Sequence, residues 1–251
     1  FHNQTSATLV PTKIQRDQLE SSGYRNVSVM ARGVDSELFN PSRRNNSLRK
    51  KWGVRADDLV LLYVGRIAGE KNLGLALSTY ERLSETDEQV KLVLVGDGPE
   101  LPTIRQQFPE AIFCGMKTGI DLAEHYASGD IFLFPSKTDT FGNVVTEAMA
   151  SGLAVVSFDY AAAHEHIQQG ENGLVVPFGD DEAYIRCATT LIDSPNLLAS
   201  IRKQARQTAM SISWDSIVDD FITRLSAGAP VKVSSHDNRK TEHGKNRITV
   251  Q

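Results

Sequence analysis

The stretch DIFLFPSKTDTFGNVVTEAMASGLAVVSF, residues 130–158, contains two apolar runs separated by a segment with helical spacing. The runs at 130–136 and 153–158 are apolar along most of their length, as in strands that are covered on both faces of a sheet. The segment between them, 142–151, is long enough for a short helix. A strand, a helix and a strand in so short a span predict a βαβ unit and therefore a parallel sheet.

The same alternation continues through most of the chain. Further apolar runs lie at 59–65, 91–98, 111–115 and 172–177, and segments with helical spacing lie at 72–84, 99–107, 119–127, 161–168 and 181–192. We therefore predict an α/β fold with a doubly wound parallel sheet. Two more helices are expected at about 195–209 and 214–225. Residues 7–35 indicate a strand, a helix and a strand that precede this domain, as if the chain entered it from elsewhere.

Composition restricts the class of protein. The chain has 251 residues with 40% hydrophobic and 23% charged side chains, which is typical of a soluble globular protein. Its net charge of -4 gives no electrostatic argument for binding nucleic acid or an anionic membrane. No apolar stretch approaches the roughly 20 residues that span a bilayer, and no signal peptide is evident. Because the chain opens on Phe1, we expect a fragment.

Two cysteines and two histidines could suggest a metal site, but we favour a different interpretation of each pair. Cys114 and Cys187 lie inside apolar segments, which favours buried thiols in a reducing compartment over a disulfide or a metal site. His164 and His166 would point to different faces of a helix, with no third ligand nearby, so we expect exposed histidines. Glu165 between them is of more interest, because it falls near a helix start at a strand end.

Ligands of such sheets bind at the carboxyl ends of the strands, so the loops there matter most. In VGRIAGEKN (64–72), Gly65 allows the backbone to turn directly after a strand. Arg66 and Lys71 follow, just before the next helix. Two cations beside a helix N-terminus favour an anion site, and specifically a phosphate, over two solvated charges.

The next loop, VGDGPELP (95–102), resembles the opening of a dinucleotide fingerprint. Gly96 and Gly98 fit that pattern, but Leu101 stands where its third glycine belongs. A tight turn into a helix that Pro99 begins explains the loop at least as well. The chain also lacks the glycine-lysine pattern of phosphate-binding loops in nucleoside triphosphatases.

The loop after the strand at 130–136 carries two carboxylates. Glu147 lies in the second turn of an apolar helix, where a charge costs free energy unless a partner binds it. We expect the two hydroxyls of a vicinal diol to be that partner. Asp139 lies at the loop tip, where it suits the hydroxyls of a second sugar or, alternatively, caps the helix. Backbone N–H groups of four residues are expected to face the same crevice, namely those of Thr140, Phe141, Gly142 and Asn143.

In these motifs the sequence resembles the retaining nucleotide-sugar glycosyltransferases of family four, which have the two-domain GT-B fold. The resemblance covers about residues 7–225. Six motifs appear in the family's order, namely RGVD with F-N-P (32–41), VGRIAGEKN, VGDGP, F-C-G (113–115), PSKTDTFGNVVTEAMASGLAVV and E-x-I-x-x-G-E-N-G (165–173). The family usually has glutamate at both acidic positions, whereas Asp139, one methylene shorter, stands at the first.

The resemblance implies a domain organisation and a set of roles. Residues 1–226 would be the C-terminal, donor-binding domain, residues 227–251 a tail that we expect to be disordered or non-native, and the N-terminal acceptor domain would be absent. Arg66 and Lys71 would bind the donor diphosphate and Glu147 the ribose hydroxyls. Asp139 and the backbone of 140–143 would contact the transferred sugar or the diphosphate. The segment Gly115–Met116 would face the base, and no metal or other cofactor would be needed.

The function that follows is retaining hexosyl transfer from a nucleoside-diphosphate sugar to a hydroxyl of a glycan or lipid acceptor. The stretch TDTFGNVVTEA is similar to that of mannosyltransferase-like members of the family, and this resemblance favours GDP-mannose over UDP-glucose as donor. We expect this chain alone to be inactive, and the protein to be cytoplasmic, with the missing domain as the part that meets the inner membrane. The alternatives are a non-catalytic sugar-nucleotide-binding module and an epimerase or phosphorylase of the same fold.

Overall fold

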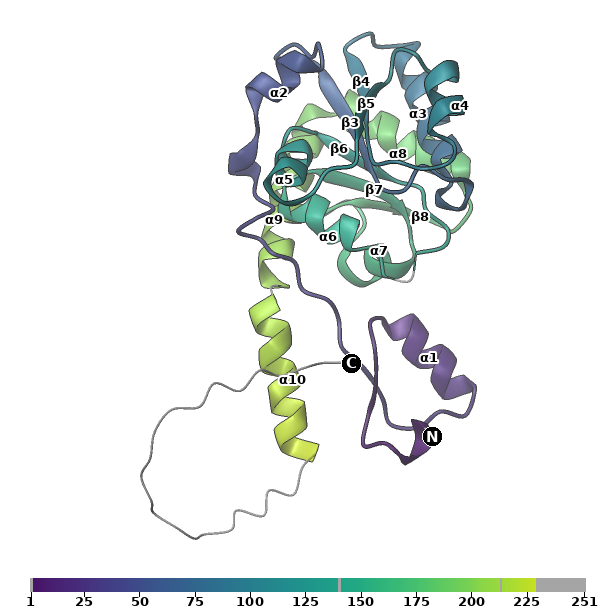
Figure 1. The fold of residues 1–251 in the computed structure, drawn as a ribbon, viewed down its shortest axis with the longest axis vertical. Helices are drawn as coiled ribbons and strands as arrows, with labels where there is room; N and C mark the ends of the chain where they lie inside the picture. The colour runs from purple at the N-terminus through teal and green to yellow at the C-terminus, as the bar shows by residue number, and fades with distance from the viewer. Residues whose placement is uncertain (1, 140, 213, 229–251) are drawn as a thin grey trace.

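A six-stranded parallel sheet forms the centre of the chain (Figure 1). The computed structural model describes residues 2–139, 141–212 and 214–228. The strands are β3 (Leu59–Val64), β4 (Val90–Val95), β5 (Ile112–Gly115), β6 (Ile131–Phe134), β7 (Ala154–Phe158) and β8 (Leu174–Val176). Their spatial order is β5-β4-β3-β6-β7-β8, and every neighbouring pair is parallel. The predicted doubly wound α/β fold is confirmed.

Helices cover both faces of this sheet (Figure 1). They are α3 (Leu73–Ser84), α4 (Leu101–Gln107), α5 (Gly119–Ala127), α6 (Asn143–Ala150), α7 (Ala161–His166), α8 (Asp181–Asp193) and α9 (Pro195–Ser211). One apolar cluster joins the sheet to α3, α4 and α8, and a second joins its other face to α5, α6 and α7. Alternate residues of β3 divide between them, since Leu61 belongs to the first cluster and Leu62 to the second. Helix α9 contributes to both.

A small unit precedes the main domain. Strand β1 (Thr8–Val10), helix α1 (Lys13–Ser21) and strand β2 (Val27–Val29) confirm the predicted strand, helix and strand. The two strands pair in parallel with each other and form a separate two-stranded sheet. No residue of α1 is buried. This unit lies apart from the six-stranded sheet, on the same side of the molecule as α10 (Trp214–Gly228) (Figure 1).

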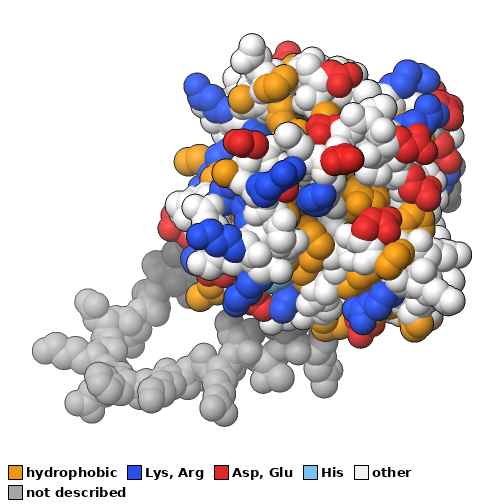
Figure 2. All heavy atoms as spheres, turned by 90° about the horizontal axis from the view of Figure 1, so that it is seen from above, with side chains coloured by type: hydrophobic (Ala, Val, Ile, Leu, Met, Phe, Trp, Pro, Cys, Tyr) orange, Lys and Arg blue, Asp and Glu red, His pale blue; other side chains and the backbone are white. Residues whose placement is uncertain are grey.

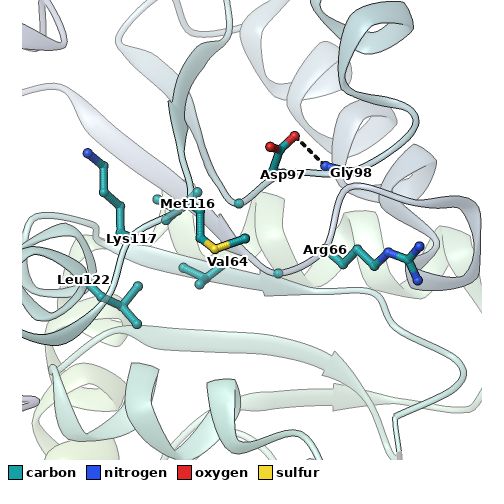
Figure 3. A pocket seen from close by; sticks show the side chains of 10 residues that line it. Val64, Arg66, Asp97, Gly98, Met116, Lys117 and Leu122 are labelled. Carbon is teal, nitrogen blue, oxygen red and sulfur yellow. Dashed lines mark hydrogen bonds between the residues drawn. The ribbon is translucent and has the colours of Figure 1, made fainter.

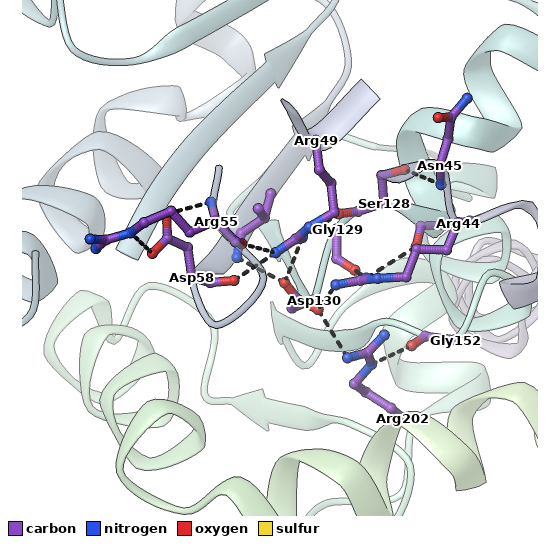
Figure 4. A network of polar contacts seen from close by, with 12 residues as sticks. Arg44, Asn45, Arg49, Arg55, Asp58, Ser128, Gly129, Asp130, Gly152 and Arg202 are labelled. Atoms are coloured by element: carbon purple, nitrogen blue, oxygen red, sulfur yellow. Dashed lines mark hydrogen bonds and ion pairs between the residues drawn. The ribbon is translucent and has the colours of Figure 1, made fainter. Parts of the chain in front are cut away.

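The segment between β2 and β3 is fastened to the sheet by charged side chains (Figure 4). The buried Asp130 carboxylate forms ion pairs with the guanidinium groups of Arg44 at 3.0 Å, Arg49 at 3.2 Å and Arg202 at 3.0 Å. The N–H of Val60 also donates a hydrogen bond to this carboxylate, at 2.9 Å. This network lies at the amino ends of β3 and β6, opposite the carboxyl ends where ligands of such sheets bind. We therefore read it as structural.

The same segment contains a helix that the sequence analysis missed. Helix α2 spans Asn46–Lys51, and its N-cap Asn45 accepts a hydrogen bond from Leu48 N–H at 3.0 Å. Asparagine at the N-cap and Gly53 just past the end were the available signals. The helix has six residues, of which only Arg49 is buried, and the Arg49 side chain pairs with Asp130 at 3.2 Å.

Helix α10 (Trp214–Gly228) is the last helix within the described residues. Helix α10 reaches Gly228, and the predicted tail beyond it lies outside the described residues. Among the residues that the structure describes, no helix has the length and apolar character to cross a bilayer. Cys114 and Cys187 are free thiols, half-buried rather than buried. On the face seen in Figure 2, positive and negative side chains are interspersed.

Candidate functional site: the carboxyl ends of β3 to β6

The strand order reverses direction between β3 and β6, because the chain proceeds from β3 towards one edge and from β6 towards the other. In open parallel sheets ligands bind outside the carboxyl ends of the strands at such a switch point. The loops that follow these two strands are the ones in which the sequence predicts Arg66, Lys71 and Asp139. The topology therefore brings the predicted cations and the predicted acid to one place.

Three hydrogen bonds hold these two loops together. Lys71 Nζ donates to Asp139 Oδ1 at 2.9 Å, and Asn72 Nδ2 donates to the carbonyl of Pro135 at 3.1 Å. Thr138 Oγ1 donates to the carbonyl of Glu70 at 2.9 Å. Lys71 and Asp139 thus face each other across the switch point, with side chains 24% and 19% exposed.

The Asp139 carboxylate is only half satisfied. Its Oδ1 pairs with Lys71, whereas Oδ2 is buried and has no hydrogen-bond partner among the residues that the structure describes. The alternative role, helix capping, is not seen for Asp139, because the N-cap of α6 is Gly142 and within the described residues Asp139 Oδ1 pairs with Lys71 and Oδ2 with no group. A buried carboxylate oxygen without a partner is costly, so a ligand hydroxyl at Oδ2 would relieve a real deficit.

A pocket of about 660 Å³ opens beside these loops (Figure 3). Its lining comes from the ends of three strands and from α5, namely Val64, Gly65, Arg66, Val95, Gly96, Asp97, Gly98, Met116, Lys117 and Leu122. Arg66 and Lys117 lie on opposite sides of it. Of the predicted site residues, Gly65, Arg66 and Met116 line the pocket. Met116 is 74% exposed, and the adjoining Gly115 ends β5.

Glycines bring the strand ends close enough to form this pocket. The N–H of Gly65 donates to the carbonyl of Val95, and the N–H of Gly96 donates to the carbonyl of Gly115. A Cβ at Gly96 would lie 1.9 Å from the Gly65 carbonyl oxygen, so any side chain there would force the two loops apart. Gly98 is equally restricted by the carbonyl of Ile67, at 2.2 Å. Gly96 and Gly98 therefore allow the loops after β3 and β4 to pack closely.

Arg66 is held less firmly than Lys71. Its side chain is 63% exposed and pairs with Glu70, four residues further on, at 3.1 Å. The carbonyl of Arg66, by contrast, is fixed by the buried Tyr63, whose hydroxyl donates to it at 2.8 Å. The backbone turn is therefore rigid, while the guanidinium is free to exchange Glu70 for another anion. Tyr63 was missed by the sequence analysis, since a tyrosine inside a buried strand is typical of core packing.

Glu147 has a partner within the protein. Tyr126 of α5 donates from its hydroxyl to Glu147 Oε2 at 2.9 Å. Burial raises the pKa of the Glu147 carboxyl, and the Tyr126 hydrogen bond opposes that rise. The buried carboxylate therefore has a partner within the protein, because α5 packs beside α6 and its tyrosine reaches Oε2, while the contact with a ligand diol stays a prediction. Nothing in the sequence alone connects residues 126 and 147.

The segment after Asp139 leads into the first turn of α6. Thr140 lies outside the described residues. Phe141 has a buried side chain, so only its backbone can face a ligand. Gly142 has φ of 85°, and a Cβ on it would lie 3.1 Å from the ring of Phe134. Asn143 is the first residue of the helix, whose N-cap Gly142 provides no side-chain cap, and in the first turn the N–H of Val145 donates to the Gly142 carbonyl at 3.0 Å.

The histidine pair beside this segment is only partly as predicted. His164 is exposed and its Nδ1 lies 2.8 Å from Asp159. His166 is half-buried against the Phe141 ring, with centroids 6.0 Å apart, so the expectation of an exposed side chain is wrong for it. Glu165 accepts from the N–H of Lys13 at 2.7 Å and thereby joins α7 to the start of α1. Within the described residues, no group of three or more His, Cys, Asp or Glu side chains is arranged to hold a metal ion.

The family model described as "Glycosyl transferases group 1" matches residues 58–194, more than half of the chain. The chain belongs to the group 1 glycosyltransferases. A GDP-mannose-dependent alpha-mannosyltransferase of Corynebacterium glutamicum is 31% identical over 221 residues, which make up 88% of this chain and 52% of that protein. The sulfoquinovosyl transferase SQD2 of Arabidopsis thaliana is 32% identical over 223 residues, covering 85% of this chain and 43% of SQD2.

Two solved structures show the same fold. HepE of Anabaena, crystallised in complex with UDP, matches with a TM-score of 0.79 at 24% identity, over 89% of this chain and 64% of that one. Sucrose-phosphate synthase of Thermosynechococcus elongatus matches with a TM-score of 0.77 at 21% identity, over 91% of this chain and 60% of the synthase. This group 1 glycosyltransferase chain spans about half the length of the curated relatives that it matches.

Proposed function

We propose that this chain is the nucleotide-sugar-binding domain of a retaining hexosyltransferase that uses a nucleoside-diphosphate sugar. The observation that carries the proposal is the Lys71–Asp139 pair, which joins two loops across the switch point of the sheet, while Asp139 Oδ2 has no partner within the described part of the chain. Lys71 is then placed to bind the diphosphate, and Asp139 Oδ2, on the side chain that pairs with Lys71, is placed to accept a hydrogen bond from a sugar hydroxyl. The pocket bounded by Arg66, Met116 and Lys117 adjoins them and takes the base.

The chemistry proposed for this site rests on the two cations. Lysine has three donors, so Lys71 can keep its bond to Asp139 and still donate to a phosphate oxygen. Arg66 exchanges Glu70 for the diphosphate, which binds it in a bidentate manner. As the bond between sugar and phosphate breaks, negative charge grows on the leaving diphosphate, and both cations stabilise it. This is the work that a metal ion does in other transferases, and we propose that this enzyme needs none.

GDP-mannose is the donor that we favour. Relatives from Corynebacterium glutamicum and from Mycobacterium tuberculosis, 31% and 33% identical to this chain, are named GDP-mannose-dependent alpha-mannosyltransferases. A thermal-shift panel of GDP, UDP, ADP and their sugars tests this directly. We expect GDP and GDP-mannose to raise the melting temperature most. A panel in which no nucleotide shifts the melting temperature would overturn the proposed function.

We further propose that transfer requires an acceptor domain that docks on the small unit and α10. Helix α10 exposes Trp214, Val218 and Ile222, which follow one another at intervals of four residues and share one face of the helix. The β1–β2 sheet lies on the same side of the molecule (Figure 1). Proximity and orientation of two substrates supply roughly 7–11 kcal/mol of barrier reduction, which this domain alone cannot provide for an acceptor.

Co-expression tests that requirement. Residues 1–251 alone should bind the donor and transfer no sugar beyond slow donor hydrolysis, whereas adding the acceptor domain of a relative should yield transfer. If residues 1–251 alone glycosylate an acceptor at ordinary enzyme rates, the two-domain assignment is wrong.

A further inference from the structure

The hydrogen bond between Tyr126 and Glu147 joins helices α5 and α6 next to the pocket. Tyr126 has 0% of its surface exposed, and its ring packs against Phe39 and Phe132, with centroids 5.5 and 5.7 Å away. A ring held from two sides cannot swing, so its hydroxyl is fixed in space. The bond at 2.9 Å therefore fixes Glu147 Oε2 as well.

This bond lies one helical turn from the pocket wall. Leu122 lines the pocket, and Tyr126 follows it by four residues, so both lie on the same face of α5. Glu147 is only half-buried, and its Oε1 accepts no hydrogen bond from any residue that the structure describes. One carboxylate oxygen is thus engaged by the protein and the other is left for a ligand.

We infer that Tyr126 is a positioning residue, which holds Oε2 of Glu147 so that Oε1 is presented to the ribose hydroxyls of the donor. This inference rests on the nucleotide-binding site proposed above. A glutamate without such a restraint would lose side-chain rotamer freedom on binding, and that loss would weaken the complex. A pre-oriented carboxylate avoids it. Tyr126 itself touches no ligand, since it is fully buried behind Glu147.

Tyr126→Phe tests the inference, because it removes one hydroxyl and keeps the ring. Tyr184→Phe is the matched control: Tyr184 is also 0% exposed, and its hydroxyl donates to the carbonyl of Val156 at 3.1 Å in the other apolar cluster. Each protein is titrated with GDP and UDP and with their 2′,3′-dideoxy analogues. The quantity compared is the dissociation constant of the dideoxy analogue divided by that of the ribonucleotide. A change that merely loosens the fold weakens both ligands alike and leaves the ratio unchanged.

In the wild type the ratio should be about ten to a hundred, as expected for hydrogen bonds to a charged group. Tyr126→Phe should lower it to about three or less, as Glu147→Gln should, while Tyr184→Phe leaves it at the wild-type value. In the double variant Tyr126→Phe, Glu147→Gln the ratio should fall no further than in either single variant.

An unchanged ratio in Tyr126→Phe would overturn this inference alone, provided that Glu147→Gln lowers it. Further reduction of the ratio in the double variant would also overturn it, because the two residues would then act independently. If the wild type binds neither GDP nor UDP, the proposed function fails, and the inference fails with it.

Discussion

Replacing Lys71 by methionine should separate binding from stability. The variant keeps the unbranched stem and removes the charge that faces Asp139 at 2.9 Å. Because both side chains are about one-fifth exposed, the lost ion pair lies between an exposed pair, which contributes up to about 1 kcal/mol, and a buried one, whose breakage costs roughly 3–5 kcal/mol. We expect a loss of about 1–2 kcal/mol in unfolding free energy.

The same substitution should weaken GDP binding by more free energy than it costs in stability. A hydrogen bond to a charged phosphate is worth roughly 1.5–3 kcal/mol, so the dissociation constant of GDP should rise about tenfold to a hundredfold. Urea unfolding gives the first quantity and titration calorimetry the second. Lys137→Met is the control, since Lys137 lies in the loop that carries Asp139 and its Nζ pairs with Asp181 at 3.3 Å rather than with Asp139. Lower stability of Lys71→Met with a dissociation constant within threefold of wild type would refute the reasoning, because Lys71 would then only fasten the two loops.

Three further outcomes are expected. Burial raises the pKa of Glu147, so the folded state retains a proton that the unfolded chain releases, and wild-type stability should fall as pH rises from about 4.3 through that raised pKa. In Glu147→Gln this fall in unfolding free energy should be absent, and urea unfolding across that pH range measures it. Unfolding free energies of the two proteins that change in parallel with pH would contradict the prediction. Asp130→Asn should lower the unfolding free energy by about 3–5 kcal/mol, because three guanidinium groups lose their carboxylate, yet GDP affinity of the folded variant should stay unchanged. EDTA treatment should leave calorimetric GDP binding intact, and a strict Mg²⁺ requirement would argue against the cationic site.

The periodicity of the sequence was sufficient to predict the sheet and its helices. Buried parallel strands are apolar throughout, and each is followed by a helix, so the βαβ units were visible without any knowledge of contacts. Helix α2 was missed because it is short and polar and is held by the Asp130 network. Side chains far apart in sequence build that network, and local pattern does not reveal them.

The candidate site was predictable where a loop follows a strand. Lys71 and Asp139 were found in that way, because the carboxyl ends of adjacent parallel strands meet at one edge. Their pairing with each other was not, since it depends on which strands are neighbours. Tyr126 was missed for the same reason, because its partner Glu147 lies 21 residues away on another helix.

Hydrogen exchange of the wild type with and without GDP tests the central claim most directly, because it reports both binding and its place. Saturating GDP should protect backbone amides at 65–72, 96–98, 115–118 and 141–147, which follow the strands at their carboxyl ends. Residues 41–58, which join the Asp130 network at the amino ends, should exchange at an unchanged rate. Protection confined to that opposite end, or none with GDP, UDP or ADP, would contradict a nucleotide site at the switch point.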